Sequence, residues 1–173
     1  MRVEIALWPN PVLLKGTKPV ERSHVDDDFR DTVRNMSALM HELRGVGLAA
    51  PQVGISRRFM LVCPSGEPED EQVVINPEIL AKEGSDEMEE GCLSFPRVFG
   101  TIQRSLKLKV RYRDLDWEEK VLDLEGFVAR VFQHELDHLN GIVFIDRMPP
   151  SDKMRNKARL EEMKLAYPPK KLV

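Results

Sequence analysis

The sequence predicts one α+β domain over residues 1–173, in which antiparallel strands surround a central helix and a further helix follows near the C-terminus. In residues 106–113 apolar and basic side chains alternate, which is typical of a strand with one face in water. From residue 126 the apolar spacing changes to that of a helix. No repeat, low-complexity tract or interior linker divides the chain, so we expect a single domain.

Composition favours a protein that stays in a reducing cytoplasm. The two cysteines are too few for a disulfide framework. No apolar run approaches membrane-spanning length, and residues 1–10 lack the pattern of a secretory signal. The 29 acidic and 26 basic residues nearly balance, so nothing at the level of the whole chain suggests a nucleic-acid-binding protein.

The N-terminal half is expected to hold a helix, a tight loop and a hairpin. Residues 26–43 form an amphipathic helix that Gly45 ends, because their apolar side chains recur at three- or four-residue intervals. Residues 45–54 are small and glycine-rich, which predicts a loop and no regular element. Residues 59–63 and 72–76 are predicted to be strands of a hairpin with a loose tip.

The C-terminal half is expected to hold a strand pair and two helices. The strand at 106–113 is followed by a return strand at 117–124. A helix follows over 126–139 and ends at an Asn-Gly pair. The last helix is predicted over 151–166, with Ser151 as its N-cap.

The segment His134-Glu135-Leu136-Asp137-His138 carries the clearest chemical signal. Two histidines at i and i+4 project from one face of a helix about 6 Å apart along its axis, so both can reach one metal ion. They share a stripe with Phe127 and Val131, which predicts that this face is buried. Glu135 lies to one side, where a carboxylate can act on a water without binding the metal.

The alternative interpretation makes these two residues core histidines with Glu135 on a solvated flank. A chance HExxH occurs on the order of once per 100 chains of this composition, so the context has to decide. The segment that starts at His41-Glu42 begins identically but has Gly45 in place of the second histidine. We interpret His41 and Glu42 as ordinary helix surface.

A catalytic site of this kind needs a third protein ligand. One protease class places a histidine where this chain has Phe144, so the ligand has to come from elsewhere. Cys92 is the candidate, because Gly91 lets the backbone turn closely and a thiolate with two imidazoles suits a divalent transition metal. Taken alone, Cys92 reads more readily as a small buried hydrophobe, and Cys63 keeps that interpretation.

The glycine loop favours substrate contact over phosphate binding. Gly45 and Gly47 follow a predicted helix and lack the Lys-Ser/Thr pair of a phosphate cradle. A plain tight turn is the other alternative. Gln52 favours a functional loop, since its amide can donate a hydrogen bond to developing negative charge.

Three motifs occur in the order and spacing of one enzyme family. They are Gly45-x-Gly47-Leu48-Ala49-Ala50-x-Gln52, Glu90-Gly91-Cys92-Leu93-Ser94 and Gln133-His134-Glu135-x-Asp137-His138-Leu139-x-Gly141. With them the chain resembles the peptide deformylases over about residues 3–147. Two departures occur near the start, Asn10 and Leu14, where family members usually have aspartate and arginine. They put a local ion pair in doubt and leave the site intact.

The resemblance implies a role for each residue of the motifs. It makes Cys92, His134 and His138 the ligands of one divalent metal, normally Fe(II), with Zn, Ni or Co able to bind. It gives Gln52 and the backbone N–H of Leu93 to the oxyanion that develops on the formyl group. Substrate backbone and methionine contacts fall to Val46, Gly47 and Gly91, and a structural ion pair to Glu90 and Arg104.

The implied activity is removal of the N-formyl group from the formylmethionine of new polypeptides, with release of formate. A metal-activated water is expected to attack the formyl carbon, with Glu135 as general base, in a bacterial cytoplasm. A zinc endopeptidase is one rival, against which Cys92 and the missing downstream histidine argue. A binding protein that has lost catalysis is the other, against which the presence of Glu135 and Gln52 argues.

The tail raises one further hypothesis. Residues 147–173 hold eight Lys or Arg against three Asp or Glu, while the rest of the chain is acidic. The plain interpretation is a solvated helix. The functional one is weak docking to the phosphate-rich ribosome, where nascent chains emerge, with no membrane and no specific nucleic acid as partner. Deletion of residues 151–173 is then expected to leave peptide turnover nearly intact.

Overall fold

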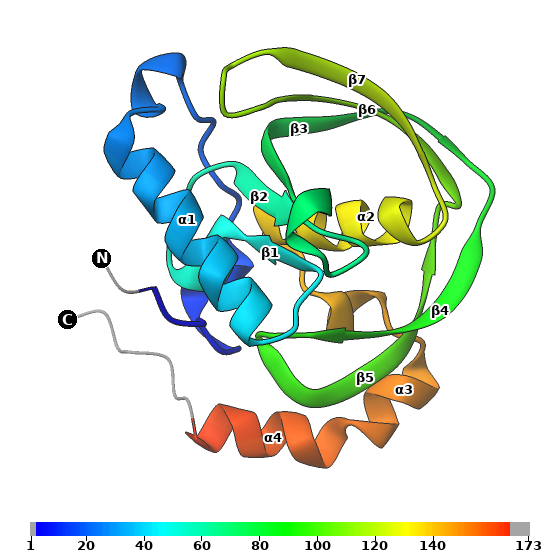
Figure 1. Cartoon of the computed structure of the whole chain (residues 1–173). Helices are drawn as coiled ribbons and strands as arrows, with labels where there is room; N and C mark the ends of the chain where they lie inside the picture. The colour runs from blue at the N-terminus through cyan, green and yellow to red at the C-terminus, as the bar shows by residue number, and fades with distance from the viewer. Residues whose placement is uncertain (1–2, 167–173) are drawn as a thin grey trace.

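The computed structural model describes residues 3–166 and confirms a mixed α+β class with antiparallel sheets (Figure 1). The strands of this range are β1 Gly47–Ala49, β2 Phe59–Val62, β3 Gln72–Glu83, β4 Asp86–Cys92, β5 Phe95–Arg104, β6 Lys107–Arg113 and β7 Glu119–Glu125. Its α-helices are α1 Asp27–Glu42, α2 Phe127–Leu139, α3 Pro150–Arg155 and α4 Lys157–Ala166. Its 3₁₀ helices are Pro11–Leu14, Arg22–His24, Ala50–Val53, Pro68–Asp70 and Phe144–Arg147. A single domain over 1–173 stays a prediction.

The strands form two separate antiparallel sheets. The larger has the order β1-β2-β3-β6-β7, and the smaller pairs β4 with β5. The β2–β3 and β6–β7 pairings confirm the two predicted strand pairs. Strand β3 runs to Glu83, well past the predicted end at residue 76, because its second half pairs with β6 far along the chain.

Strands β1, β4 and β5 were not expected from the sequence. The predicted loop 45–54 contains β1, whose three residues are all buried and pair with β2. In β4 the side chains of residues 87–89 are exposed, so the strand lacks an apolar alternation that a sequence pattern could reveal. These segments become strands through pairing, β1 with β2 and β4 with β5.

Helix α1 begins as predicted but ends slightly earlier. The Asp26 side chain accepts a hydrogen bond from the Phe29 N–H and caps the first turn. The helix ends at Glu42, and the left-handed residue after it is Arg44, at φ 56°, not Gly45. The residue His41, expected on the surface, is half-buried and hydrogen-bonds Glu71 at 2.9 Å.

Helix α2 carries the HELDH segment and lies against β1, β2 and β7. All of its residues from Ala129 to Leu139 are buried, so it is enclosed on nearly every side (Figure 1). Phe127, expected on the buried stripe, is 44% exposed because it opens the helix at the rim of a cavity. Within residues 3–166, none of the helices is long and apolar enough to span a membrane.

The predicted helix over 151–166 is two helices. Helix α3 ends at Arg155, and α4 starts at Lys157 after Asn156, whose buried side chain bonds the backbone of β5. Ser151 lies inside α3 and is not its N-cap, a position that Pro149 takes. The two helices run beside β5 (Figure 1).

Candidate active site

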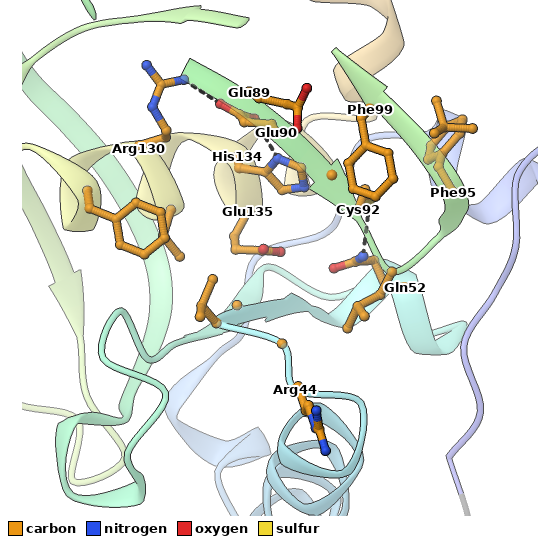
Figure 2. Close-up of a pocket in the computed structure, with 18 of the residues that line it drawn as sticks. Arg44, Gln52, Glu89, Glu90, Cys92, Phe95, Phe99, Arg130, His134 and Glu135 are labelled. Atoms are coloured by element: carbon orange, nitrogen blue, oxygen red, sulfur yellow. Dashed lines mark hydrogen bonds and ion pairs between the residues drawn. The ribbon is translucent and has the colours of Figure 1, made fainter. Parts of the chain in front are cut away.

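Side chains from β4, from the 3₁₀ turn after β1 and from α2 converge on one place (Figure 2). Cys92 ends β4, Gln52 lies in the 3₁₀ turn after β1, and His134 and Glu135 come from α2. The ligand atoms of Cys92, His134 and His138 all lie within 4.8 Å of one another. Cys92 Sγ is 3.3 Å from His138 Nε2. The fold therefore brings the three predicted metal ligands together.

A cavity of ≈ 420 Å³ opens over these groups, a size typical of small-ligand sites. Eight of the nine predicted site residues line it: Val46, Gly47, Gln52, Gly91, Cys92, Leu93, His134 and Glu135. The ninth, His138, is 1% exposed and contacts two residues that line the cavity, Cys92 and His134. Exposed Phe99 and Phe127 stand at its margin.

The orientation of His134 is set by a buried carboxylate. His134 Nδ1 lies 2.8 Å from Glu90 Oε1, which leaves Nε2 as the atom available to a metal. Arg104 donates to both Glu90 oxygens, at 2.8 and 2.9 Å, and Arg130 donates to Oε2 at 2.6 Å. Burial opposes ionisation, but the hydrogen bonds from Arg104 and His134 hold the pKa of Glu90 well below its usual range.

The expected ion pair of Glu90 with Arg104 is thus confirmed as part of a larger network. Asp137, the fourth residue of the HELDH segment, accepts from Arg104 at 2.7 Å and from Arg147 at 2.7 Å. Neither Asp137 nor Arg130 was predicted as a site residue. The spacing carried a signal for Arg130, which lies one helical turn before His134 and so shares its face.

Glu135 is buried against β1 with one oxygen unpaired. A Cβ added to Gly47 would lie only 2.5 Å from Glu135 Oε1, so the glycine makes room for the carboxylate. Among the described residues, Glu135 Oε2 and His138 Nδ1 are the two buried side-chain atoms without a hydrogen-bond partner. Burial raises the pKa of Glu135 to about 7.

Gly47→Ala is expected to displace this carboxylate. A Cβ would approach the Cδ and Cγ atoms of Glu135 to 2.8 Å, closer than packing allows. We expect kcat/KM to fall about a hundredfold, the order of loss when a reacting group is misplaced by an ångström. Gly16→Ala is the matched control, because nothing lies within 4 Å of its Cβ position. Equal kinetics for the two variants would contradict the close approach.

Gln52 is held with its amide N–H group toward the cysteine. Its Oε1 accepts the Ala49 N–H at 2.9 Å, which fixes the amide orientation. Its Nε2 then donates to Ser94 Oγ at 3.3 Å and lies 3.5 Å from Cys92 Sγ. Leu93 follows Cys92 in the turn between β4 and β5 and lines the same cavity. Ser94 was not predicted as a site residue.

The residues present fit a divalent metal ion. One thiolate and two imidazoles form a donor set suited to a transition metal, and three protein ligands leave a position for water or substrate. Burial lowers the pKa of His138 and favours the neutral ring that binds metals. Burial also disfavours a charged His134, but hydrogen bonds to Cys92 and Glu90 raise its pKa. The raised pKa favours a protonated His134 ring, and a bound cation would displace the added proton.

Fold and site together define the class of the protein, a hydrolase with an HExxH segment on helix α2 and a possible Cys/His/His metal site. The chain belongs to the polypeptide deformylase family, whose model matches residues 3–154. It is therefore an enzyme of N-terminal protein processing, a step of protein biosynthesis, and the family is metal-dependent.

Relatives of known name support this assignment over nearly the full chain. The peptide deformylase of Thermotoga sp. (strain RQ2) is 45% identical over 160 residues, covering 92% of this chain and 94% of the relative. That of Chlorobium luteolum is 40% identical over 167 residues, covering 94% and 87%.

Solved structures agree with the sequence relatives. The peptide deformylase of Plasmodium falciparum superposes with a TM-score of 0.91 at 36% identity, covering 95% of this chain and 96% of that one. The peptide deformylase of Legionella pneumophila superposes with a TM-score of 0.88 at 36% identity, covering 98% and 100%.

Proposed function

We propose that the cavity binds the formylmethionyl end of nascent polypeptides and that the enzyme hydrolyses the formamide to formate and a free amine. The proposed location is a bacterial cytoplasm, and residues 1–173 form one catalytic domain. One observation carries the proposal: Glu135, with an unpaired oxygen, lies in the same cavity as Cys92 and His134. A buried carboxylate beside a cluster able to hold a metal supports the assignment of Glu135 as proton acceptor.

Cys92, His134 and His138 would hold one divalent ion, Fe(II) natively, with Zn, Ni or Co able to take its place. When bound, the ion would supply Lewis-acid chemistry that lowers the pKa of a water toward neutrality and polarises the formyl oxygen. The chain's own part is to keep the thiolate and the two neutral rings aimed at one point, which Glu90 does for His134.

Glu135 acts as the general base. Its unpaired Oε2 accepts the proton of the attacking water and later returns it to the leaving nitrogen. Gln52 Nε2 and the Leu93 N–H donate hydrogen bonds to the developing oxyanion, each worth about 3 kcal/mol by analogy with other oxyanion holes. The Ala49 N–H keeps the Gln52 amide in the orientation that this role needs.

The substrate backbone lies between two strand edges. Within the described residues, β1 ends its sheet and β4 pairs only with β5, so both have an edge without a strand partner. The cavity is lined at these edges by Val46, Gly47 and Gly91. In the proposed complex, the backbone of an extended peptide pairs with these three residues. The methionine side chain enters the apolar part of the cavity beside Val131.

The test is formate release from formyl-Met-Ala-Ser, with metal analysis of protein purified without oxygen. We expect stoichiometric formate and one transition metal ion per chain. Cleavage of an internal peptide bond without formate would favour an endopeptidase. Binding of the peptide without either product would favour a protein that has lost catalysis.

We also propose weak ribosome docking through the C-terminal helices. Arg155 pairs with Asp152, Arg159 with Glu162 and Lys164 with Glu161, so these cations are partly neutralised. Lys153 of α3 and Lys157 of α4 are exposed cations of the described part of the chain. Lys170 and Lys171, which belong to the basic tail of residues 147–173, lie outside the described residues.

Charge reversal at these two lysines tests the docking. We expect Lys153→Glu/Lys157→Glu to lower co-sedimentation with purified ribosomes severalfold at low salt, because each phosphate contact releases counterions. Deletion of residues 151–173 is a poorer test, since side chains of this segment bond β5. Equal sedimentation of the variant and the wild type across a salt series would leave α3 and α4 as a solvated surface.

A further inference from the structure

The outer edge of β5 is covered by side chains where another strand would normally pair. Within the described residues β5 pairs only with β4. On its other edge, Asp152 Oδ2 accepts the Thr101 N–H at 2.6 Å, and Asn156 Nδ2 donates to the Phe99 oxygen at 2.8 Å. An antiparallel strand would supply the same pattern, an acceptor for one residue and a donor for the residue two before it.

A third contact secures the start of the strand. Arg159 Nε of α4 donates to the Pro96 oxygen at 3.1 Å. Asp152 and Asn156 are nearly fully buried, so the hydrogen bonds of these two side chains to β5 are shielded from water. Met148 packs against Gly100 so closely that a Cβ there would lie 2.7 Å from its methyl carbon. We call Asp152, Asn156 and Arg159 the edge clamp.

The edge clamp spans an irregular stretch of β5 beside the candidate metal site. Cys92 pairs with Phe95 while Gly91 pairs with Phe99, so residues 96–98 bulge out of the ladder. Arg97 in this bulge has φ 63°, a conformation that costs a non-glycine residue free energy and needs support from its surroundings. The bonds to the Pro96 and Phe99 oxygens lie on either side of it.

The bulged stretch also forms a wall of the substrate cavity. Phe95, Arg97, Val98 and Phe99 all line it. The Phe99 ring lies against Gly91, 2.9 Å from a Cβ added there, so the position of β5 determines the width of the cavity at Gly91. Asn156 and Arg159 lie beyond residues 3–154, which match the family model, so two of the three edge-clamp residues are outside the matched region.

We propose that the edge clamp positions the β5 wall of the cavity, so that the C-terminal helices set the affinity of the enzyme for its formyl-peptide. Asp152, Asn156 and Arg159 are positioning residues, since they act through the backbone of β5. The proposal rests on the proposed placement of the peptide beside Gly91. It also replaces the expectation that deletion of residues 151–173 leaves peptide turnover intact.

The test compares Asp152→Ala with Asp152→Asn, which keeps an oxygen for the Thr101 N–H. Met154→Ala is the control, because Met154 is 71% exposed on the same helix. We expect Asp152→Ala to raise the KM for formyl-Met-Ala-Ser about fivefold or more, the order of one lost hydrogen bond, with kcat within twofold of wild type. Asp152→Asn and Met154→Ala are expected to keep the wild-type KM.

Amide hydrogen exchange at Thr101 supplies a readout independent of catalysis. Exchange is expected to accelerate at least about tenfold in Asp152→Ala and to stay slow in Asp152→Asn. A smaller rise in KM, a failure of asparagine to restore it, or unchanged Thr101 exchange overturns the proposal. If Asp152→Ala does not fold, Asn156→Asp, which places an acceptor against the Phe99 oxygen, has to show the same KM rise. Faster Thr101 exchange with an unaltered KM would show that the edge clamp holds β5 without setting peptide affinity, which overturns the proposal. Such a result would not contradict the proposed hydrolysis, because the enzyme would still turn over the formyl-peptide.

Discussion

Replacing Glu135 with glutamine is expected to lower kcat for a formyl-peptide by at least about a hundredfold while metal content and fold persist. General-base catalysis typically contributes that much or more, and an amide cannot accept the proton. Glutamine has nearly the volume of glutamate, so the fit beside Gly47 survives. Kinetics with formyl-Met-Ala-Ser, metal analysis and a thermal melt of the same preparation measure the three quantities.

The chain offers a matched control for this substitution. Glu42 follows His41 in a second His-Glu-Leu segment, and it is exposed at the end of α1. Glu42→Gln is expected to keep wild-type turnover. Near wild-type turnover of Glu135→Gln with metal bound would remove Glu135 from its role, and another group of the cavity would have to accept the proton.

The elements with local sequence signals were predicted well. The start of helix α2 at Phe127 agrees with the change of the apolar spacing from a two-residue to a helical period at residue 126. Strand β6 agrees with its alternation of apolar and basic side chains. Strand β4 was missed, because a run of acidic residues becomes a strand only through pairing with β5. The break at Asn156 was missed for a similar reason, since its buried bond to β5 is a long-range contact.

The site residues were found through motifs, and of the residues that support them only the Glu90–Arg104 ion pair was expected. The predictions of His134, His138 and Cys92 depend on residue types whose chemistry is visible in the sequence, and the resemblance implied the same three ligands. Asp137 acts on the site through Arg104, and such a contact between charged residues far apart in the sequence leaves no periodic signal. Arg130, which bonds Glu90, shares the helix face of His134, and that spacing was overlooked. Their carboxylate and guanidinium groups are buried, and each is paired, which is the condition for burying charge.

Cys92→Ala is expected to abolish tightly held metal, because only the two imidazoles of His134 and His138 would remain. Dialysis against a mild chelator followed by metal analysis should find less than about a tenth of an equivalent, where the wild type keeps one. Activity should fall with the metal, while the melt changes little if the buried network around Glu90 stays paired.

Cys63→Ala is the control for that experiment. Cys63 is the other free cysteine, fully buried after β2, where its thiol donates to the Glu67 oxygen at 3.1 Å. Its loss leaves a small cavity and is expected to reduce stability by about 1 kcal/mol while one equivalent of metal and full turnover persist. Full metal occupancy in Cys92→Ala would show that the third ligand lies elsewhere. Metal loss in both variants would point to a general loss of structure, which makes the difference between the two cysteines the deciding measurement.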